Sequence, residues 1–103
     1  MSKADVVLEI CCDINNPEKT VIKTNAKKEA LREILEAWLS CQIGQGKDES
    51  EPNRHDTYKI KIQLDLTDDT FYTDSDTGNK GLTCGIVMDV SERLDKIKVL
   101  DLS

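Results

Sequence analysis

The stretch "YTDSDTGNKGLTCGIVMDV" (residues 72–90) decides the fold, because its second half fits two kinds of secondary structure. Apolar residues alternate there without a break from Leu82 to Val90, which is typical of a half-buried strand. Apolar residues also recur at every fourth position from Leu82 to Leu94, and the polar run "SERLDK" after Val90 is typical of a helix end. A comparison with the first half of the chain favours a helix over residues 80–95.

The first half of the chain predicts a hairpin followed by a helix. "DVVLEICCDI" (5–14) alternates like a strand, "NNPEK" is typical of a turn, and "TVIKT" (20–24) is a short β-branched run. Apolar residues in "AKKEALREILEAWLSCQIG" (26–44) then recur at helical spacing, with Asn25 as the expected N-cap and Gly44 as the expected stop. The expected apolar stripe of this helix is Leu31, Ile34, Leu35, Trp38, Leu39 and Gln42.

The second half of the chain repeats this pattern. "TYKIKIQLDL" (57–66) is predicted as a strand. A two-residue turn at Asp68 and Asp69 would place Phe71 opposite Leu66 on the apolar face of a second hairpin. Superimposing the two halves aligns Leu8 with Ile62, Ile10 with Leu64, Leu31 with Leu82, Leu35 with Ile86 and Leu39 with Val90.

We therefore predict one domain over residues 1–103 with an α+β fold. Residues 1–43 and 57–103 are the two halves of an internal ββα pseudo-repeat, and the polar segment 44–56 joins them as an exposed, flexible loop. "IKVLDL" (97–102) adds a last strand, so the order is ββαββαβ: a two-layer sandwich with an antiparallel sheet and two helices on one face. If "TVIKT" does not pair, the order becomes βαββαβ, the ferredoxin-like arrangement.

Composition and charge limit the classes of function. The chain has 103 residues, 38% of them hydrophobic and 33% charged, and its net charge of −6 makes nucleic acids poor partners. No apolar run is long enough to cross a membrane and the first residues lack signal-peptide features, so we expect a cytoplasmic protein without membrane contact. The cysteines lack the spacing of a zinc site and are expected to be reduced, buried or half-buried thiols. They are Cys11, Cys12, Cys41 and Cys84.

The loop over residues 74–81 is the candidate ligand site. It begins like a calcium loop, but its glycine and asparagine stand in the wrong order and the twelfth position, Gly85, is not a glutamate. A phosphate loop would need a serine or threonine after the lysine, where this chain has glycine. We favour capping of the following helix by Asp76, Thr77 or Asn79; the alternative is a weak divalent-ion or small-ligand site. Its candidate ligands are Asp74, Asp76, Asn79 and Lys80.

The sequence shows no catalytic pattern. His55, the single histidine, lies in a polar loop that would not orient it beside a nucleophile. No hydrolase, metalloprotease or paired-carboxylate motif stands out, so we predict no enzyme activity and no cofactor. Trp38 is expected in the core; in the alternative it is partly exposed beside Cys41 and Ile43, as an interface anchor.

The second face of the predicted sheet is the main candidate for function. It mixes polar residues with apolar ones and lacks the aromatic and basic field of an RNA-binding sheet. We therefore expect a protein that acts through protein contacts, or as a homodimer, on this face or its last strand; the alternative is a regulatory domain that binds a ligand or metal at residues 74–81. The candidate face residues are Val7, Glu9, Cys11, Lys59, Lys61 and Tyr72.

Overall fold

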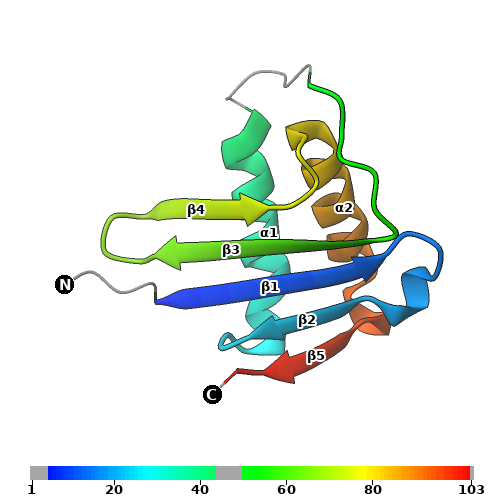
Figure 1. Ribbon diagram of the computed structural model, residues 1–103. Helices are drawn as coiled ribbons and strands as arrows, with labels where there is room; N and C mark the ends of the chain where they lie inside the picture. Colours follow the sequence, from blue (N-terminus) through cyan, green and yellow to red (C-terminus); the bar gives the residue numbers. More distant parts are fainter. Residues whose placement is uncertain (1–4, 44–49, 103) are drawn as a thin grey trace.

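The computed structural model describes residues 5–43 and 50–102, which form five strands and two helices (Figure 1). This is an α+β fold, and the strands and helices follow one another in the predicted order ββαββαβ. In chain order the elements are β1 (Val6–Asp13), the 3-10 turn η1 (Pro17–Lys19), β2 (Val21–Thr24), α1 (Lys28–Ile43), β3 (Thr57–Asp65), β4 (Thr70–Ser75), α2 (Lys80–Glu92), the 3-10 turn η2 (Leu94–Lys96) and β5 (Lys98–Asp101).

The five strands form one mixed sheet in the order β4-β3-β1-β2-β5. The prediction of a purely antiparallel sheet was wrong, because β5 runs parallel to β2. The helix α2 crosses the strands from the β4 edge to the opposite edge, where the chain emerges beside β2 (Figure 1). Since β2 does pair with β1, the alternative βαββαβ order does not apply.

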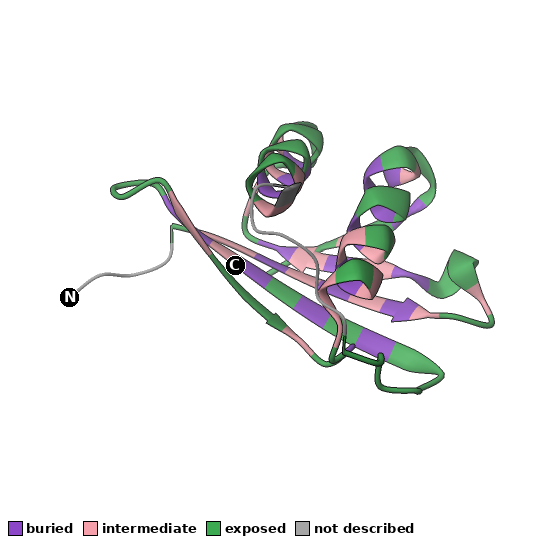
Figure 2. Cartoon of the chain, turned by 90° about the horizontal axis from the view of Figure 1, so that it is seen from above, coloured by how far each residue is buried: buried purple, intermediate pink, exposed green. Residues whose placement is uncertain are grey.

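Both helices lie on the same side of the sheet, and the core fills the space between them and the strands (Figure 2). Alternate strand residues are buried there, as a pleated sheet with one covered face requires. The helix α1 contributes Leu31, Leu35 and Trp38, which confirms its predicted stripe, whereas Gly44 lies outside the described residues. The strands contribute Leu8, Ile10, Ile22, Ile60 and Ile62, and the region from α2 onward Val87, Val90, Leu94 and Ile97.

Residues 80–92 form a helix, but its buried stripe differs from the predicted one. Val87 is fully buried, whereas Leu82 and Ile86 are only partly buried. Thr83 replaces Leu82 on the inner side, because its hydroxyl bonds those of Ser75 at 2.8 Å and Thr77 at 2.6 Å. These hydrogen bonds set the rotation of α2 about its axis at its first turn.

Asn25 does not cap α1, contrary to the prediction. Its side-chain oxygen accepts a hydrogen bond from the backbone N–H of Val7 at 2.9 Å, and its side-chain nitrogen donates to the carbonyl of Asp5 at 3.2 Å. The hydroxyl of Thr24 instead accepts from the N–H of Ala26. Asn25 therefore joins the end of β2 to the start of β1, and the helix begins three residues later at Lys28.

The turn between β3 and β4 is longer than predicted. Asp65 pairs with Thr70, so residues 66–69 form a four-residue connection, and Phe71 lies opposite Leu64 instead of Leu66. The buried Asp65 carboxylate accepts hydrogen bonds from the N–H groups of Thr67 and Asp68, which close this four-residue turn. Leu66 consequently lies in the turn with 61% of its surface exposed.

Trp38 belongs to the core, as expected. The alternative interpretation, in which it is partly exposed and anchors an interface, was wrong. Only 1% of the residue is exposed, and its indole N–H donates to the Thr73 hydroxyl of β4 at 2.8 Å. This hydrogen bond connects the middle of α1 to the edge strand of the sheet. Tryptophan fits the position because a buried indole needs one hydrogen-bond acceptor.

Thr73→Val is expected to lower the free energy of unfolding by about 1 kcal/mol, because it leaves the Trp38 indole N–H without an acceptor while keeping side-chain shape. Urea unfolding followed by tryptophan fluorescence measures the change. Thr57→Val is the matched control, since Thr57 is exposed and makes no side-chain hydrogen bond within the described residues. Equal effects of the two substitutions would contradict a stabilising role for the indole hydrogen bond.

Candidate functional site

The sheet face opposite the helices is the candidate site, and we call it the open face (Figure 2). Side chains alternate along a strand, so the residues between the buried ones project to this side. Within residues 5–43 and 50–102, no helix or strand covers it. The open face comprises Val7, Glu9, Cys11 and Asp13 of β1, Val21 and Lys23 of β2, Thr57, Lys59, Lys61, Gln63 and Asp65 of β3, Thr70, Tyr72 and Asp74 of β4, and Lys98 and Leu100 of β5.

All six predicted face residues lie on this surface, and the structure adds ten more. Val21 and Lys23 could have been found from the alternation of "TVIKT" once this segment was known to pair. Lys98 and Leu100 could not have been placed from the sequence, because the side of the sheet on which they lie depends on β5 pairing in parallel with β2. The strand register arranges the middle of the face in three rows. These are Tyr72–Gln63–Val7, then Asp74–Lys61–Glu9–Lys23–Leu100, then Lys59–Cys11–Val21–Lys98.

The open face carries charges of both signs in equal number. It has four lysines and four carboxylates, two of which, Asp13 and Asp65, lie at the ends of β1 and β3. Glu9 occupies the centre, between Lys61 on one side and Lys23 on the other, and its carboxylate lies 3.9 Å from the Lys59 ammonium. An exposed ion pair of this length contributes little to stability.

Aspartates near the strand ends are engaged by the backbone. Each of four carboxylates accepts a hydrogen bond from one or two backbone N–H groups. The oxygen of a neutral capping residue such as serine or asparagine could accept the same hydrogen bonds. Their negative charge therefore lies at turns and strand ends, whereas Glu9 and Asp74 lie in the middle row of the face beside Lys61. The pairs are Asp5 with Leu66, Asp13 with Asn15 and Asn16, Asp65 with Thr67 and Asp68, and Asp76 with Lys59.

A shallow hollow of about 340 Å³ lies at one corner of the open face, beside the Cys11 thiol. Lys19 of η1 and Lys59 of β3 contribute cationic side chains to its wall. The hollow is small enough for one partner side chain and is open to solvent. Its other lining residues are Cys11, Cys12, Asp13, Thr57, Tyr58 and Asp76.

The four cysteines are unpaired thiols in different surroundings. Cys11 lies half-buried on the open face, and its neighbour Cys12 is buried on the helix side. Burial raises the pKa of the Cys11 thiol above its ordinary value, and Glu9 raises it further, whereas Lys23 and Lys59 oppose the shift. Cys41 is exposed, so the expectation that every thiol is at least half-buried was wrong.

Glu9→Gln is expected to lower the pKa of Cys11, because it removes a negative charge beside the thiol. At pH 8 a lower pKa increases the thiolate fraction, so Cys11 should react faster with iodoacetamide than in the unchanged protein. Mass spectrometry of the Cys11 peptide over time measures the rate. Glu36→Gln on the outer side of α1 is the control, and equal rates in both variants would show that Glu9 does not act on the thiol.

Hydrogen bonds within the protein hold the predicted ligand loop, residues 74–81, in place. Asn79 is the N-cap of α2, with its side-chain oxygen accepting from the N–H of Leu82 at 2.9 Å, which confirms the capping interpretation. One Asp76 oxygen accepts from the N–H of Lys59 at 2.8 Å. Asp74 is exposed on β4, beside Lys61 across the strands. Among the described residues, no group of three or more His, Cys, Asp or Glu side chains is placed to hold a metal ion.

Residues 50–53 run alongside this loop. The N–H of Asn53 donates to the carbonyl of Thr77 at 2.6 Å, and its side chain donates to the carbonyl of Asp76 at 3.1 Å. The Ser50 hydroxyl donates to the carbonyl of Gly78, and Asn79 donates to the carbonyl of Ser50. The polar segment is exposed as predicted over residues 50–56, and Ser50 and Asn53 connect it to the loop before α2; residues 44–49 lie outside the described residues.

Gly78→Ala is expected to destabilise the protein by about 1–3 kcal/mol. Gly78 has φ of 71°, and an added Cβ would lie 2.6 Å from the Asn53 side chain. Gly85→Ala is the matched control, because Gly85 lies in α2 with no atom near an added Cβ, so it should stabilise by about 0.5–1 kcal/mol. Thermal unfolding measures both, and a neutral Gly78→Ala would show that the loop adopts another conformation in solution.

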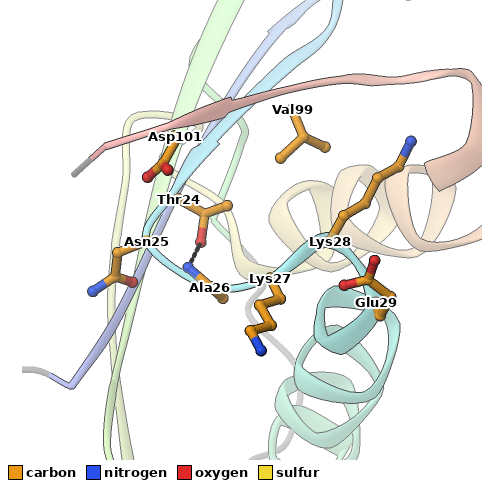
Figure 3. Close-up of a pocket in the computed structure, with 8 residues that line it drawn as sticks. All are labelled: Thr24, Asn25, Ala26, Lys27, Lys28, Glu29, Val99 and Asp101. Atoms are coloured by element: carbon orange, nitrogen blue, oxygen red, sulfur yellow. Dashed lines mark hydrogen bonds between the residues drawn. The ribbon is translucent and has the colours of Figure 1, made fainter.

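Three further clefts are seen among the described residues. The first, of about 380 Å³, lies where α1 begins, and the Lys27 and Lys28 side chains point away from each other there (Figure 3). The second, of about 480 Å³, is lined by Ile14, Glu51, Pro52, Asn53, Arg54, His55, Tyr58 and Leu82. The third, of about 550 Å³, is lined by Arg54, His55, Asp56 and Thr57. His55 is exposed, with its ring edge-on to that of Tyr58 at 5.7 Å between centroids and its backbone N–H donating to the phenol oxygen.

Comparison of the chain with models of known families, with curated proteins and with solved structures finds no match. Among the described helices, none has the length and apolar character needed to cross a membrane.

Proposed function

We propose that this chain is a non-enzymatic protein-binding module of the cytoplasm, and that its open face is the binding surface. One observation carries the proposal: both helices cover the same side of the sheet, while the other side combines apolar side chains with lysines. The apolar members are Val7, Cys11, Val21, Tyr72 and Leu100.

The size of the open face suits a small protein interface. Five strands at about 4.8 Å spacing span roughly 20 Å, and eight residues of β1 extend roughly 26 Å. The resulting footprint of at most roughly 520 Å² is smaller than the roughly 800 Å² that each partner buries in a standard interface. Tyr72, with 54% of its surface exposed, supplies the aromatic contact that often dominates such surfaces.

The lysines suit this role as well as the apolar residues do. A lysine side chain can lay its methylene groups over neighbouring apolar atoms while its ammonium stays in water. Lys59 and Lys98 can cover Cys11 and Val21 in this way, because the four residues form one row. A partner could then bind the apolar residues by displacing flexible lysine stems.

We also propose that the two ββα units are a structural pseudo-repeat within a two-layer sandwich. The sheet order supports this, because β1 and β3 are adjacent in the centre while β2 and β4 flank them. In each unit the hairpin is followed by a helix on the covered side. The open face then contains the outer surfaces of two similar hairpins, extended by β5.

A photo-crosslinking amino acid at two positions tests the binding surface. Tyr72→p-benzoylphenylalanine places the probe on the open face, and Met88→p-benzoylphenylalanine places it on α2 at a similar exposure of 52%. In extracts of the source cells, the first probe is expected to give one dominant protein adduct that excess unlabelled protein prevents. If both positions give the same adducts, or unlabelled protein does not compete, the open face is not the binding surface.

A further inference from the structure

We propose that two copies of this chain pair through β4, so that their sheets become one continuous sheet and their α1 helices lie side by side. The inference does not rest on the proposed function, because pairing at the β4 edge leaves the open face uncovered. It follows from the unpaired backbone of β4, from the register that a twofold axis allows, and from an apolar flank of α1.

β4 forms one edge of the sheet, and every second residue along it has backbone groups without a partner (Figure 1). Just after the strand, the N–H of Asp76 donates to the carbonyl of Lys59. Residues of an antiparallel strand bond alternately to one side and to the other, so every second residue before Asp76 also bonds β3. The remaining residues direct their N–H and C=O groups outward, where these make no hydrogen bond within the described chain. They are Phe71, Thr73 and Ser75.

β4 lacks the features that commonly protect an exposed sheet edge. Its six residues, "TFYTDS", all pair with β3 in one unbroken register, without a bulge, and include neither proline nor lysine. The opposite edge of the sheet, β5, is shorter, with four residues, and carries the charged side chains of Lys98 and Asp101. A further strand is therefore accommodated more readily at β4 than at β5.

A twofold axis through Thr73, perpendicular to the sheet, gives the register that pairs most of β4. Thr73 would face Thr73 of the second copy, and Phe71 would face Ser75 of the second copy, so all the outward groups would be hydrogen-bonded. An axis through Asp74 would bring two carboxylates together, and an axis through Tyr72 would leave Ser75 opposite the β3–β4 turn. Because the contact is the same on both copies, it closes after two chains.

Strand pairing alone would bury too little surface for a stable dimer. The six residues of β4 extend roughly 20 Å, and neighbouring strands lie only about 4.8 Å apart. The resulting strip is much smaller than the roughly 800 Å² that each partner buries in a standard interface. A stable dimer therefore needs a second contact beside the paired strands.

One flank of α1 can supply this second contact. The hydrogen bond from Trp38 to Thr73 places the middle of α1 next to the residue on the proposed axis. Beside the core stripe of α1, apolar residues recur at spacings of four, three and four, a pattern typical of helices that pair. Two of them are partly exposed and two are fully exposed: Ala30 and Ile34, then Ala37 and Cys41.

This flank is turned away from α2. The helix α1 runs from the β2 side of the sheet to the β4 edge, with α2 next to it on one side (Figure 1). In a right-handed helix that runs in this direction with Leu35 and Trp38 toward the sheet, Ile34 and Cys41 lie on the side opposite α2. The small side chain of Ala37 would let a second helix approach closely near the axis.

A second copy of the chain fits this edge better than an extended peptide does. A peptide would pair with the outward groups of β4 but would leave the apolar flank of α1 in water. A second copy related by the twofold axis brings its own α1 to that flank, because its Trp38 is held to the same Thr73. Both unpartnered features are thus covered by a single contact.

Mass and amide exchange of the unchanged protein test the strand pairing. As its concentration rises from about 5 to about 500 µM, light scattering should find a mass approaching twice the 11.6 kDa of one chain. Over the same range, the N–H groups of Phe71, Thr73 and Ser75 should exchange with D₂O at least about tenfold more slowly, because they become hydrogen-bonded. The N–H of Val99, which faces outward at the β5 edge, is the control and should exchange as before.

A charge beside the axis tests the helix contact. Ala37→Glu would bring two carboxylates together, so dimerisation should weaken at least about tenfold. Met88→Glu adds the same charge at an exposed apolar position of α2 and should dimerise like the unchanged protein. Both positions are exposed, so thermal unfolding should find both variants folded.

Three results would overturn the proposal. The first is a mass of one chain over the whole concentration range. The second is a dimer in which Phe71, Thr73 and Ser75 exchange as fast as in dilute solution, because its contact would then lie on the open face or at β5. The third is equal dimerisation of the Ala37→Glu and Met88→Glu variants.

Discussion

Burial of one face of the sheet under both helices is the constraint on which the rest of this structure depends. Because side chains alternate along each strand, placing Ile10 and Ile62 in the core necessarily places Glu9 and Lys61 on the other side. The open face is thus a direct consequence of how the core is packed. Any change that shifted a strand by one residue would exchange the two faces and destroy both.

Local hydrogen bonds at the strand ends keep that arrangement in register. Asn25 joins the end of β2 to the start of β1, Asp65 closes the β3–β4 turn, and Asn79 caps α2. These polar residues satisfy backbone groups that would otherwise lack partners. Oxygen atoms of these side chains are thus occupied by backbone N–H groups.

Much of the candidate face was predictable because strand alternation is a local property. The pattern of "TYKIKIQLDL" places Lys59 and Lys61 on the side opposite the core, whichever strand lies next to β3. The helix over residues 80–92 was also predictable, from the recurrence of apolar positions. Its exact inner stripe was not, because hydroxyl contacts between Thr83 and Thr77 set the rotation of the helix, and those depend on how the preceding turn folds.

The sequence by itself determined the elements, their order and which residues of each strand share a side, since these follow from periodicity and from turn-forming residues. Only the tertiary structure decided that β5 joins the sheet parallel to β2, and thereby that Lys98 and Leu100 complete the open face. It also decided that Asn25 bonds β1 instead of capping α1. The physical reason is the same in each case: the neighbour of a strand edge or of a polar side chain is chosen by non-local packing, which leaves no local pattern in the chain.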